Sequence, residues 1–446
     1  MITGGSPHLG VLGTPSVSAD FARALEWLYS FSDMERGVGW NSRSSPRLEW
    51  NLRRTRVLLD LAAAPDRKMI CVLVAGTKGK GSTSAMLARI LCASGIRTGL
   101  YTKPHLQTYR ERIRVDGVAI DETEFAAEVD ALRPLATELS RRVPAAGAPT
   151  TFELTTVLAL AHFAAHACRV AVVEVGLGGR LDATNAVDPH VSVITPISHD
   201  HTKLLGSRLS QIALEKAGVL RPGRVAVLAP QPASARATLL RQCARVAAEP
   251  REVRPLSLRL VPRGALALRG DHQRVNAAVA IAAADALAEH GVPLRGDGVA
   301  ALGDLRVPGR FEVVPGEPLT ILDGAHNDGS ALALARALER EFPRRRVRLV
   351  IGVMQDKDAR AVVGPLLARA SAVYATRAPG PRGLDAARLA RLVRGVGVSV
   401  IEDPADALGA ARASASRGEI VCVTGSLALV GRARDVLGLP IAERLW

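Results

Sequence analysis

A short apolar segment that runs into a glycine-rich loop and then a helix constrains this chain most. Residues 71–76 (CVLVAG) predict a buried strand, and residues 82–94, with an Ala/Leu/Ile face, predict a helix. Glycines let the backbone wrap closely around phosphate oxygens, and a helix N-terminus adds free N–H groups and partial positive charge. The predicted phosphate-binding residues are Gly76, Thr77, Lys78, Gly79, Lys80, Gly81 and Ser82.

The sequence of this loop departs from the strict P-loop motif G-x-x-x-x-G-K-[ST], because Gly81 separates Lys80 from Ser82. The alternative is a plain glycine-rich turn between strand and helix. Strand, glycines, lysine, hydroxyl and helix nevertheless occur in the order that phosphate binding requires. Lys80 is the residue expected to reach the β and γ phosphates of a nucleotide.

The rest of the chain repeats the strand–helix alternation. Further strands are predicted at 98–102, 170–176 and 191–196, and helices at 21–30, 53–63, 122–141, 152–167 and 275–290. Nearly continuous apolar strands indicate a parallel sheet covered on both faces. Residues 250–270 mix short apolar and polar stretches with Pro and Gly, which favours a small antiparallel section.

A second alternation of strands and helices begins after a connector at 307–314. Its strands are predicted at 319–323, 347–353, 372–375, 398–401 and 420–424. The expected fold is therefore α/β: a P-loop, doubly wound, mostly parallel sheet domain followed by a smaller Rossmann-like domain. We expect a flexible tail at 1–18, a first domain with the phosphate-binding loop at 19–306 and a second domain at 307–446.

The chain is strongly basic, which suggests a negatively charged partner. It has 446 residues with 58 basic and 43 acidic side chains, a formal net charge of +15, yet only seven of the basic residues are lysine. Nucleic acid is one explanation, and acidic small molecules or an arginine-rich background are the others. Aromatic residues make up 3% and the arginines are spread along the chain, so we expect no nucleic-acid partner.

Five widely spaced cysteines without a C-x-x-C pair predict neither a disulfide scaffold nor a zinc site of that type, and fit a reducing cytoplasm. The N-terminus lacks the basic-then-apolar pattern of a signal peptide. The longest apolar candidate, 157–175, is interrupted by His162, His166 and Arg169. We therefore expect no membrane partner and a cytoplasmic location.

Several segments carry a resemblance to a known family. GTKGKGS (76–82) resembles the G-T-x-G-K-G-[ST] loop of the Mur-type amide ligases. Nine ordered segments resemble its dihydrofolate synthase/folylpolyglutamate synthase branch: KPHL (103–106), TTFELTT (150–156), VVEVGLGGRLDATN (172–185), HDHTKLLG (199–206), ALEKAGVLRPG (213–223), DHQRVNAAVA (271–280), PGRF (308–311), LDGAHN (322–327) and DKD (356–358).

The resemblance implies an ATP-dependent ligase that converts a pterin carboxylate to an acyl phosphate, which the amine of L-glutamate then attacks. It implies ATP, one or two Mg²⁺ ions, dihydropteroate or reduced folate and L-glutamate as ligands, and a monomer. Two alternatives are a Mur-type ligase that joins another carboxylate to another amino acid, and a nucleotide-binding homologue with impaired catalysis. A basic site fits because two anions and a moving phosphoryl group must be held together.

The resemblance also assigns the site residues. It implies catalytic roles for Lys80, Glu174, His201 and Lys216, with Mg²⁺ held by Glu174, His201 and Ser82 and with carbamylation expected at the Lys216 position. ATP contacts fall on Asn276, Arg310 and Asp323. Substrate contacts fall on Phe152, Glu153, Leu181, Asp182, Ala183, His326 and Asn327. The plainer alternatives are a solvated strand-end glutamate, a helix-surface lysine, a linker arginine, a turn aspartate and an Asn327 helix cap.

Two lysines depart from the family pattern. Lys78 stands where the family loop commonly has asparagine, and Lys103 stands where it has a metal-binding serine. An ammonium has no lone pair and cannot bind a cation. The metal site then lacks a ligand, or the ammonium replaces part of the ion's charge, or Thr102 substitutes, or the activity or substrate has changed. Our hypothesis is that Lys103 contacts phosphate directly.

Overall fold

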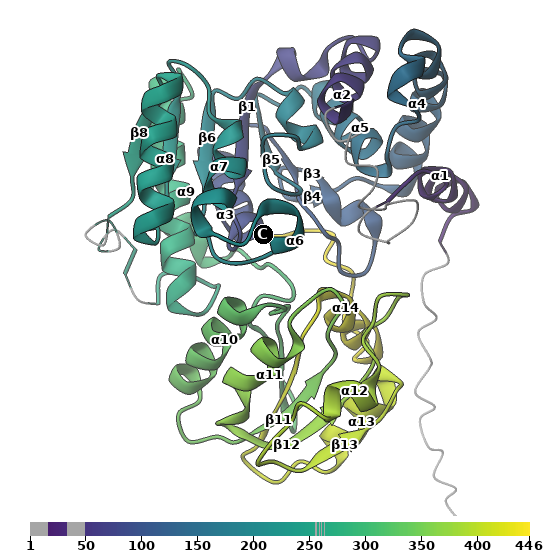
Figure 1. Cartoon of the computed structure of the whole chain (residues 1–446), viewed down its shortest axis with the longest axis vertical. Coiled ribbons are helices and arrows are strands. Elements are labelled where there is room, and N and C mark those ends of the chain that lie inside the picture. The colour runs from purple at the N-terminus through teal and green to yellow at the C-terminus, as the bar shows by residue number, and fades with distance from the viewer. Residues whose placement is uncertain (1–16, 34–49, 255–256, 258, 260, 263) are drawn as a thin grey trace, which may run out of the picture.

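The computed structural model describes residues 17–33, 50–254, 257, 259, 261–262 and 264–446. The chain forms two α/β units, one from the purple and teal part of the chain and one from the green and yellow part (Figure 1). The predicted tail at 1–18 lies almost wholly outside the described residues. The expected α/β fold with two sheets is confirmed.

The first unit is built on an eight-stranded sheet in the order β4-β3-β2-β5-β1-β6-β7-β8. Its strands are β1 (Ile70–Ala75), β2 (Thr98–Tyr101), β3 (Ile113–Val115), β4 (Val118–Ala119), β5 (Val170–Glu174), β6 (Val191–Ile194), β7 (Val225–Leu228) and β8 (Glu249–Glu252). All neighbours from β2 to β8 pair in parallel, and β3 and β4 are antiparallel.

Helices cover both faces of this sheet. They are α1 (Ala19–Tyr29), α2 (Trp50–Leu61), α3 (Lys80–Ala93), α4 (Glu122–Arg142), α5 (Thr151–Ala165), α6 (Thr202–Leu205), α7 (Leu209–Lys216), α8 (Ala233–Val246) and α9 (Asp271–Glu289). Alternate residues of β1 point to opposite faces: Leu73 packs in the core with α4, α5 and α8, whereas Val72 and Val74 pack in the core with α3 and α9. This double burial explains why the strand is apolar throughout.

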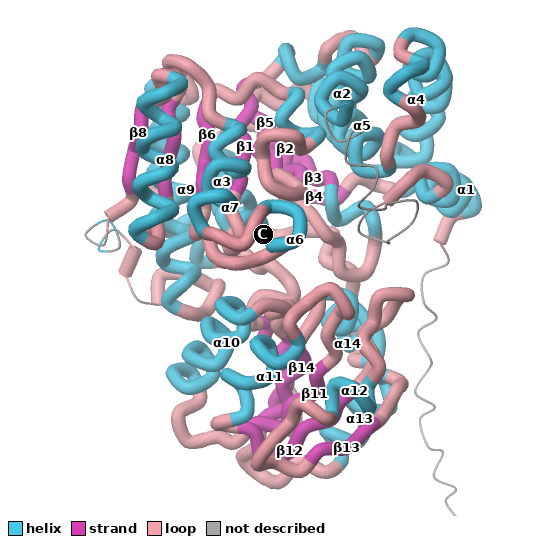
Figure 2. Tube along the Cα trace, in the orientation of Figure 1, coloured by secondary structure: helices cyan, strands magenta, loops and turns pink. Residues whose placement is uncertain are grey.

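The second unit has a six-stranded sheet in the order β13-β12-β11-β14-β10-β9, of which only the edge strand β9 is antiparallel. Its strands are β9 (Glu312–Val314), β10 (Leu319–Leu322), β11 (Val347–Ile351), β12 (Ala370–Ala375), β13 (Val398–Val400) and β14 (Ile420–Thr424). Its helices are α10 (Asp328–Glu341), α11 (Ala359–Leu367), α12 (Ala386–Ala390), α13 (Pro404–Ala413) and α14 (Leu427–Val436). The five predicted strands are all present, and β11, β12, β13 and β14 can be followed in magenta in Figure 2.

Two expectations are corrected. The antiparallel part of the large sheet is β3 and β4, not residues 250–270, where β8 instead pairs in parallel with β7; part of 250–270 lies outside the described residues. In addition, the last residues do not stay with the second unit. Ala119 donates its N–H to the carbonyl of Glu443 at 2.9 Å, and Leu445 is buried in the core of the first unit.

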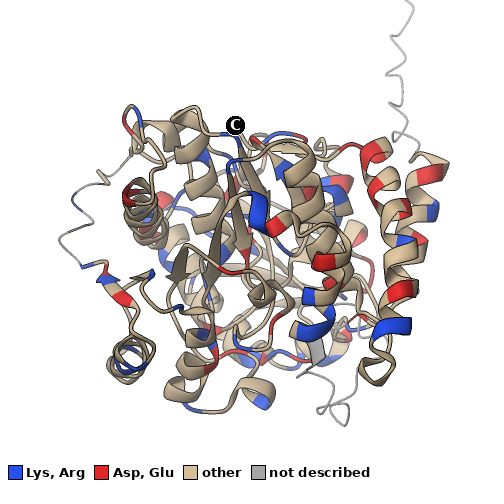
Figure 3. Cartoon of the chain, turned by 90° about the horizontal axis from the view of Figure 1, so that it is seen from above, with Lys and Arg blue, Asp and Glu red and all other residues tan. Residues whose placement is uncertain are grey.

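Basic and acidic residues are interspersed along the ribbon in Figure 3. Among the described residues no helix combines the length and apolar character needed to cross a bilayer. All five cysteines are free thiols, and four of them are buried.

Candidate active site

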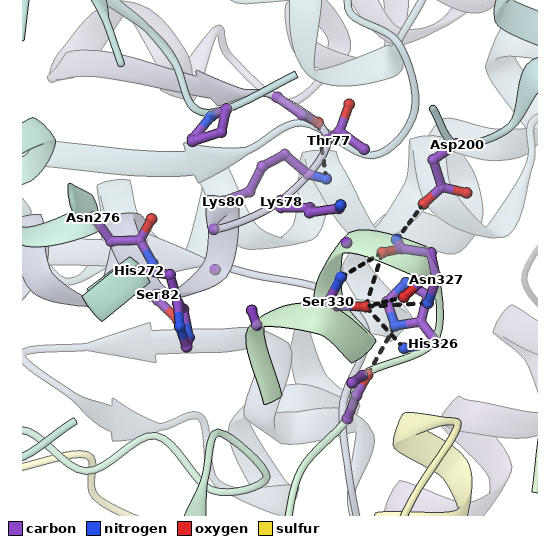
Figure 4. Close-up of a pocket in the computed structure, with 18 of the residues that line it drawn as sticks. Thr77, Lys78, Lys80, Ser82, Asp200, His272, Asn276, His326, Asn327 and Ser330 are labelled. Atoms are coloured by element: carbon purple, nitrogen blue, oxygen red, sulfur yellow. Dashed lines mark hydrogen bonds between the residues drawn. The ribbon is translucent and has the colours of Figure 1, made fainter. Parts of the chain in front are cut away.

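The two units enclose a cavity of about 390 Å³. Its walls come from the loop after β1, the ends of β5 and β6, the start of α9, and the segment between β10 and α10. The carboxyl ends of parallel strands are where doubly wound sheets bind ligands. Figure 4 shows Lys78 and Lys80 from the first unit on one side and Asn327 and Ser330 from the second on the other.

The glycine-rich loop keeps its backbone close to neighbouring elements. Gly76 and Gly79 have φ values of +146° and +80°. A Cβ on Gly76 would lie 1.8 Å from Oγ1 of Thr195, and one on Gly79 would lie 2.2 Å from Oδ1 of Asn276. Both positions therefore require glycine, and the loop leads directly into the N-terminus of α3. This is the cradle that a phosphate group needs.

Two lysine ammonium groups converge on the same backbone carbonyl of this loop. Nζ of Lys80 and Nζ of Lys216 donate to the oxygen of Gly76 at 3.2 and 2.7 Å. Burial lowers the pKa of Lys80, partly offset by Glu174, and burial together with Lys80 lowers the pKa of Lys216 to about 7. Cations held this close repel one another, so an anion bound here would be favoured.

Glu174 is the carboxylate at the end of β5, and 4% of it is exposed. Its Oε2 accepts the backbone N–H of Lys103 at 3.1 Å. Burial raises the pKa of Glu174, while Lys80 opposes that shift. A buried carboxylate facing a cavity is costly unless a cation or further donors satisfy it.

His201 follows β6 and lines the same cavity. Partial burial and the ammonium of Lys357 lower the pKa of His201 to about 4, so its ring is neutral at pH 7 and keeps a lone pair. Three possible metal ligands line the cavity: the carboxylate of Glu174, the neutral imidazole of His201 and the hydroxyl of Ser82. Mg²⁺ prefers the two oxygen ligands to the imidazole nitrogen. Phosphate oxygens and water would have to complete such a site.

Lys103 contacts Glu174 through its backbone, whereas its side chain turns elsewhere. Nζ of Lys103 lies 5.6 Å from the centroid of the Phe152 ring. Phe152 in turn stacks on Tyr101 with centroids 6.1 Å apart. Lys103, in place of the family serine, therefore donates its backbone N–H to Glu174 and adds a positive charge to the cavity wall.

The second unit contributes a carboxylate and a helix start. Asp323 accepts the N–H groups of Phe311 and Ala325 at 2.8 and 2.9 Å. Burial raises its pKa, while the guanidinium of Arg310 opposes the shift. Asn327 is the N-cap of α10, where its side chain accepts the N–H of Ser330 at 3.0 Å.

His326 and Asn276 also line the cavity. His326 Nδ1 shares a hydrogen bond of 2.8 Å with the carbonyl of Gly324. Burial and Lys357 lower the pKa of His326 to about 4, which leaves its ring neutral. Nδ2 of Asn276 donates to Oε1 of Gln273 at 2.9 Å.

Asp200 connects the two units through a contact that no sequence pattern predicts. Asp200 Oδ1 lies 2.7 Å from Nζ of Lys357, and its Oδ2 accepts Nδ2 of Asn327 at 3.0 Å. Burial alone would raise the pKa of Asp200, but Lys357 and His201 hold it well below its usual range. Nearby, Nζ of Lys78 lies 3.7 Å from Asp328. The segments HDHTKLLG and DKD marked these positions, but gave no role to Asp200.

The residues predicted to bind substrate from the segments around Phe152 and Asp182 lie outside the cavity wall. Phe152 and Asp182 lie directly behind Gly176, whose Cβ would come 2.7 Å from each of them. Asp182 accepts the N–H groups of Leu177 and Thr184 at 2.7 and 3.1 Å, which is the turn role that the sequence left open. Leu181 and Ala183 flank it in the chain and are likewise absent from the lining of the cavity among the described residues.

Glu153 has a different partner from the one expected. Its carboxylate receives Nη2 and Nε of Arg54 at 2.7 and 2.9 Å, and the N–H of Thr150 at 3.0 Å. Only 1% of the Glu153 side chain and 4% of the Arg54 side chain are exposed. The structure thus places Glu153 in a buried ion pair at the start of α5.

Comparisons with known proteins agree with this geometry. The Mur ligase middle domain matches residues 74–222, and the Mur ligase glutamate ligase domain matches residues 309–427. The chain is 34% identical to the dihydrofolate synthase/folylpolyglutamate synthase of Mycobacterium tuberculosis, over 88% of this chain and 91% of that protein.

Two solved structures share the fold. One is a Mycobacterium tuberculosis folylpolyglutamate synthase complexed with ADP and AMPPCP, with a TM-score of 0.83, 31% identity, and coverage of 95% of this chain and 99% of that one. The other is a bifunctional folylpolyglutamate synthase/dihydrofolate synthase with Mn, AMPPNP and L-glutamate bound. Its TM-score is 0.78 at 30% identity, with coverage of 96% of this chain and 100% of that one.

Proposed function

The chain belongs to the dihydrofolate synthase/folylpolyglutamate synthase branch of the Mur ligase family, and from this premise we propose that it joins a pterin carboxylate to L-glutamate with ATP. The carboxylate receives the γ-phosphoryl group, which turns one of its oxygens into a good leaving group. The amine of glutamate then attacks the acyl carbon, and ADP and phosphate are released. The observation that carries the proposal is the cationic cavity between the two units, with the glycine loop on one wall.

The loop residues bind the phosphates of ATP in this proposal. Backbone N–H groups from Gly79 to Ser82, at the N-terminus of α3, donate to phosphate oxygens, while Lys80 offsets their charge. The N–H groups of Thr77 and Lys78 instead donate to the carbonyl of Pro196. Arg310 and Asp323 bring the second unit to the nucleotide, and Asn276 contacts it from α9. Because these groups come from both units, closure of the units would complete the site.

A divalent ion such as Mg²⁺ would be held by Glu174, His201 and Ser82, and it would spread the charge of the transferring phosphoryl group. Glu174 fits this role because it is a buried carboxylate on the cavity wall. Lys216 has the lowered pKa that carbamylation requires, since only the neutral amine reacts with CO₂. We place glutamate at His326 and Asn327, beside the start of α10, and the pterin at the side of Phe152, Leu181, Asp182 and Ala183.

The remaining expectations stay as proposals. We propose a monomer in the cytoplasm, consistent with five free thiols, and domain boundaries near 18/19 and 306/307. Light scattering of the purified protein and localisation of a tagged chain would test the first two.

The decisive assay measures ADP release with dihydropteroate and with tetrahydrofolate, each with and without L-glutamate. Turnover that needs both a pterin and glutamate supports the proposal, and the preferred pterin tells which of the two activities is present. A Lys80→Met variant should lose turnover, while the matched surface variant Lys68→Met should keep it. Turnover with another acid–amino-acid pair only, or ATP hydrolysis without any acceptor, would contradict it.

A further inference from the structure

A second group of metal-binding side chains lies between α4 and α5, in the helical layer at the upper right of Figure 1. Glu124 and Glu128 are one turn apart on α4, and His162 and His166 are one turn apart at the end of α5. Residues four apart lie on the same face of a helix. Each helix therefore presents a pair of like ligands, and the two pairs face each other.

The distances bring Glu124, His162 and His166 into one cluster, with Glu128 beside His162. Nε2 of His166 lies 3.1 Å from Oε1 of Glu124, and Nδ1 of His162 lies 3.8 Å from Oε1 of Glu128. The two imidazole rings have centroids 4.2 Å apart. Within the described part of the chain, Glu124, His162 and His166 form the only group of three or more His, Cys, Asp or Glu residues whose ligand atoms all lie within 4.8 Å of one another.

The surroundings favour a cation over a simple pair of hydrogen bonds. The hollow that these four side chains line is otherwise walled by Ala127, Ala131 and Ala165, and its described lining contains no lysine or arginine. Small methyl groups leave room between the helices, and two carboxylates supply two negative charges. His162 is 2% exposed, so its imidazole is held in the interior rather than turned to solvent.

We propose that Glu124, Glu128, His162 and His166 bind one divalent transition-metal ion of the Zn²⁺ class, which joins α4 to α5. Imidazole nitrogens with one or two carboxylate oxygens are an established ligand set for Zn²⁺, and Mg²⁺ prefers oxygens alone. Ligand atoms about 2.1 Å from a common centre in a tetrahedron stand about 3.4 Å apart. The ligand atoms of Glu124, His162 and His166 already lie within 4.8 Å of one another, so side-chain rotations would bring them to that spacing, and a further rotation would add Glu128, which now lies beside His162.

This site is separate from the cavity between the two units. His162 lies ten residues after Phe152 on α5, about 15 Å farther along the helix axis at 1.5 Å per residue. The ion would therefore act on the packing of α4 against α5 and not on the reaction. The inference does not depend on the proposed ligase activity.

The test uses the full chain, freed of metal and kept in excess Mg²⁺ so that oxygen-rich sites are filled. Zn²⁺ alone is titrated by calorimetry against a competing chelator, and Co²⁺ is titrated by its visible absorption, which is far more intense in tetrahedral than in octahedral sites. Wild type should bind one ion and melt at a higher temperature with Zn²⁺. His166→Ala and Glu124→Gln should weaken binding at least about tenfold, since loss of even an outer-shell partner costs about 10–100-fold.

Asp130→Asn is the matched control, because it removes an exposed carboxylate from the same helix without touching the cluster. It should bind Zn²⁺ like the wild type. Equal affinity in wild type, His166→Ala and Glu124→Gln would overturn the proposal, as would a wild type that binds no ion besides Mg²⁺. Both test residues are partly exposed, and Glu128→Gln supplies a further variant if either fails to fold.

Discussion

Replacing Glu153 by Gln separates a structural role from a substrate-binding role at a position where the family resemblance and the structure differ. The carboxylate accepts two N–H groups of Arg54 and one of Thr150, with both charged side chains almost fully buried. Gln has the same size, but its amide NH₂ would face donors that need an acceptor. The guanidinium of Arg54 would then be buried without a countercharge.

The expected loss follows from that burial. Removing one partner of a buried ion pair costs about 3–5 kcal/mol, because the other charge stays uncompensated. At about 2–4 °C per kcal/mol for a domain of this size, the first unit should melt about 6–20 °C lower. Glu138→Gln is the matched control, since Glu138 forms exposed pairs with Arg141 and Arg142 on α4. Such solvent-screened surface pairs add little stability, so this variant should melt close to the wild-type temperature.

The assay is thermal unfolding followed by circular dichroism, with binding of nucleotide and pterin measured well below the transition. Glu153→Gln should lower the melting temperature and leave the intrinsic affinity for pterin unchanged. The double variant Arg54→Met/Glu153→Leu should recover at least half of the loss, because apolar residues of similar volume replace buried pairs with little cost. An unchanged melting temperature together with weaker pterin binding would refute the reasoning and restore Glu153 as a substrate contact.

Four further outcomes are expected. Gly79→Ala should let the ligand-free loop leave its left-handed conformation, because a left-handed alanine costs about 1–2 kcal/mol and its Cβ would overlap the amide of Asn276. Nucleotide binding must then restore that conformation, so calorimetry should show affinity about 5–30-fold weaker. Gly364→Ala, whose Cβ meets nothing within 4 Å, should bind nucleotide normally. Lys103→Ser should weaken nucleotide binding if the ammonium contacts phosphate, and unchanged affinity and rate at every Mg²⁺ concentration would sink that hypothesis. Lys357→Met should favour an open arrangement of the two units by about 1.5–3 kcal/mol, seen as a longer distance between fluorophores placed on each. Folding lowers the pKa of Lys216 from 10.5 to about 7, so between these pH values the unfolded chain binds one proton more than the folded chain. The free energy of unfolding of the wild type, relative to Lys216→Met, should therefore rise from pH 7 to 10. The rise is at most about 1.4 kcal/mol per pH unit.

Runs of apolar residues predicted the strands correctly where both faces of the sheet are covered by helices. The strands β1, β5, β6 and β14 are apolar runs, and each is buried along nearly its whole length. By contrast β8 (Glu249–Glu252) is polar and half exposed, so its parallel pairing with β7 left no hydrophobic signal. Its register is set by the neighbouring strand, which a single segment does not reveal.

The sequence indicated which residues lie near the ends of strands, but not which distant residues contact one another. The glycine loop and Glu174 could be located because a strand precedes each of them. The pairing of Asp200 with Lys357 joins residues 157 positions apart on two different units, and no periodicity within either segment encodes such a contact. For Glu153 the motif supplied the residue but not the direction of its side chain, which Arg54 on another helix decides.

The return of the chain end to the first unit has a mechanical consequence. The connector between the units and the final residues cross the same boundary side by side, because Arg306 donates its N–H to the carbonyl of Leu445 at 2.8 Å. The guanidinium of Arg110 and the carboxylate of Glu443 secure the second crossing to the first unit. Two adjacent chain crossings restrict rotation of the second unit relative to the first more than a single crossing would. A closing motion would therefore bring the same residues of the second unit to the same wall of the cavity.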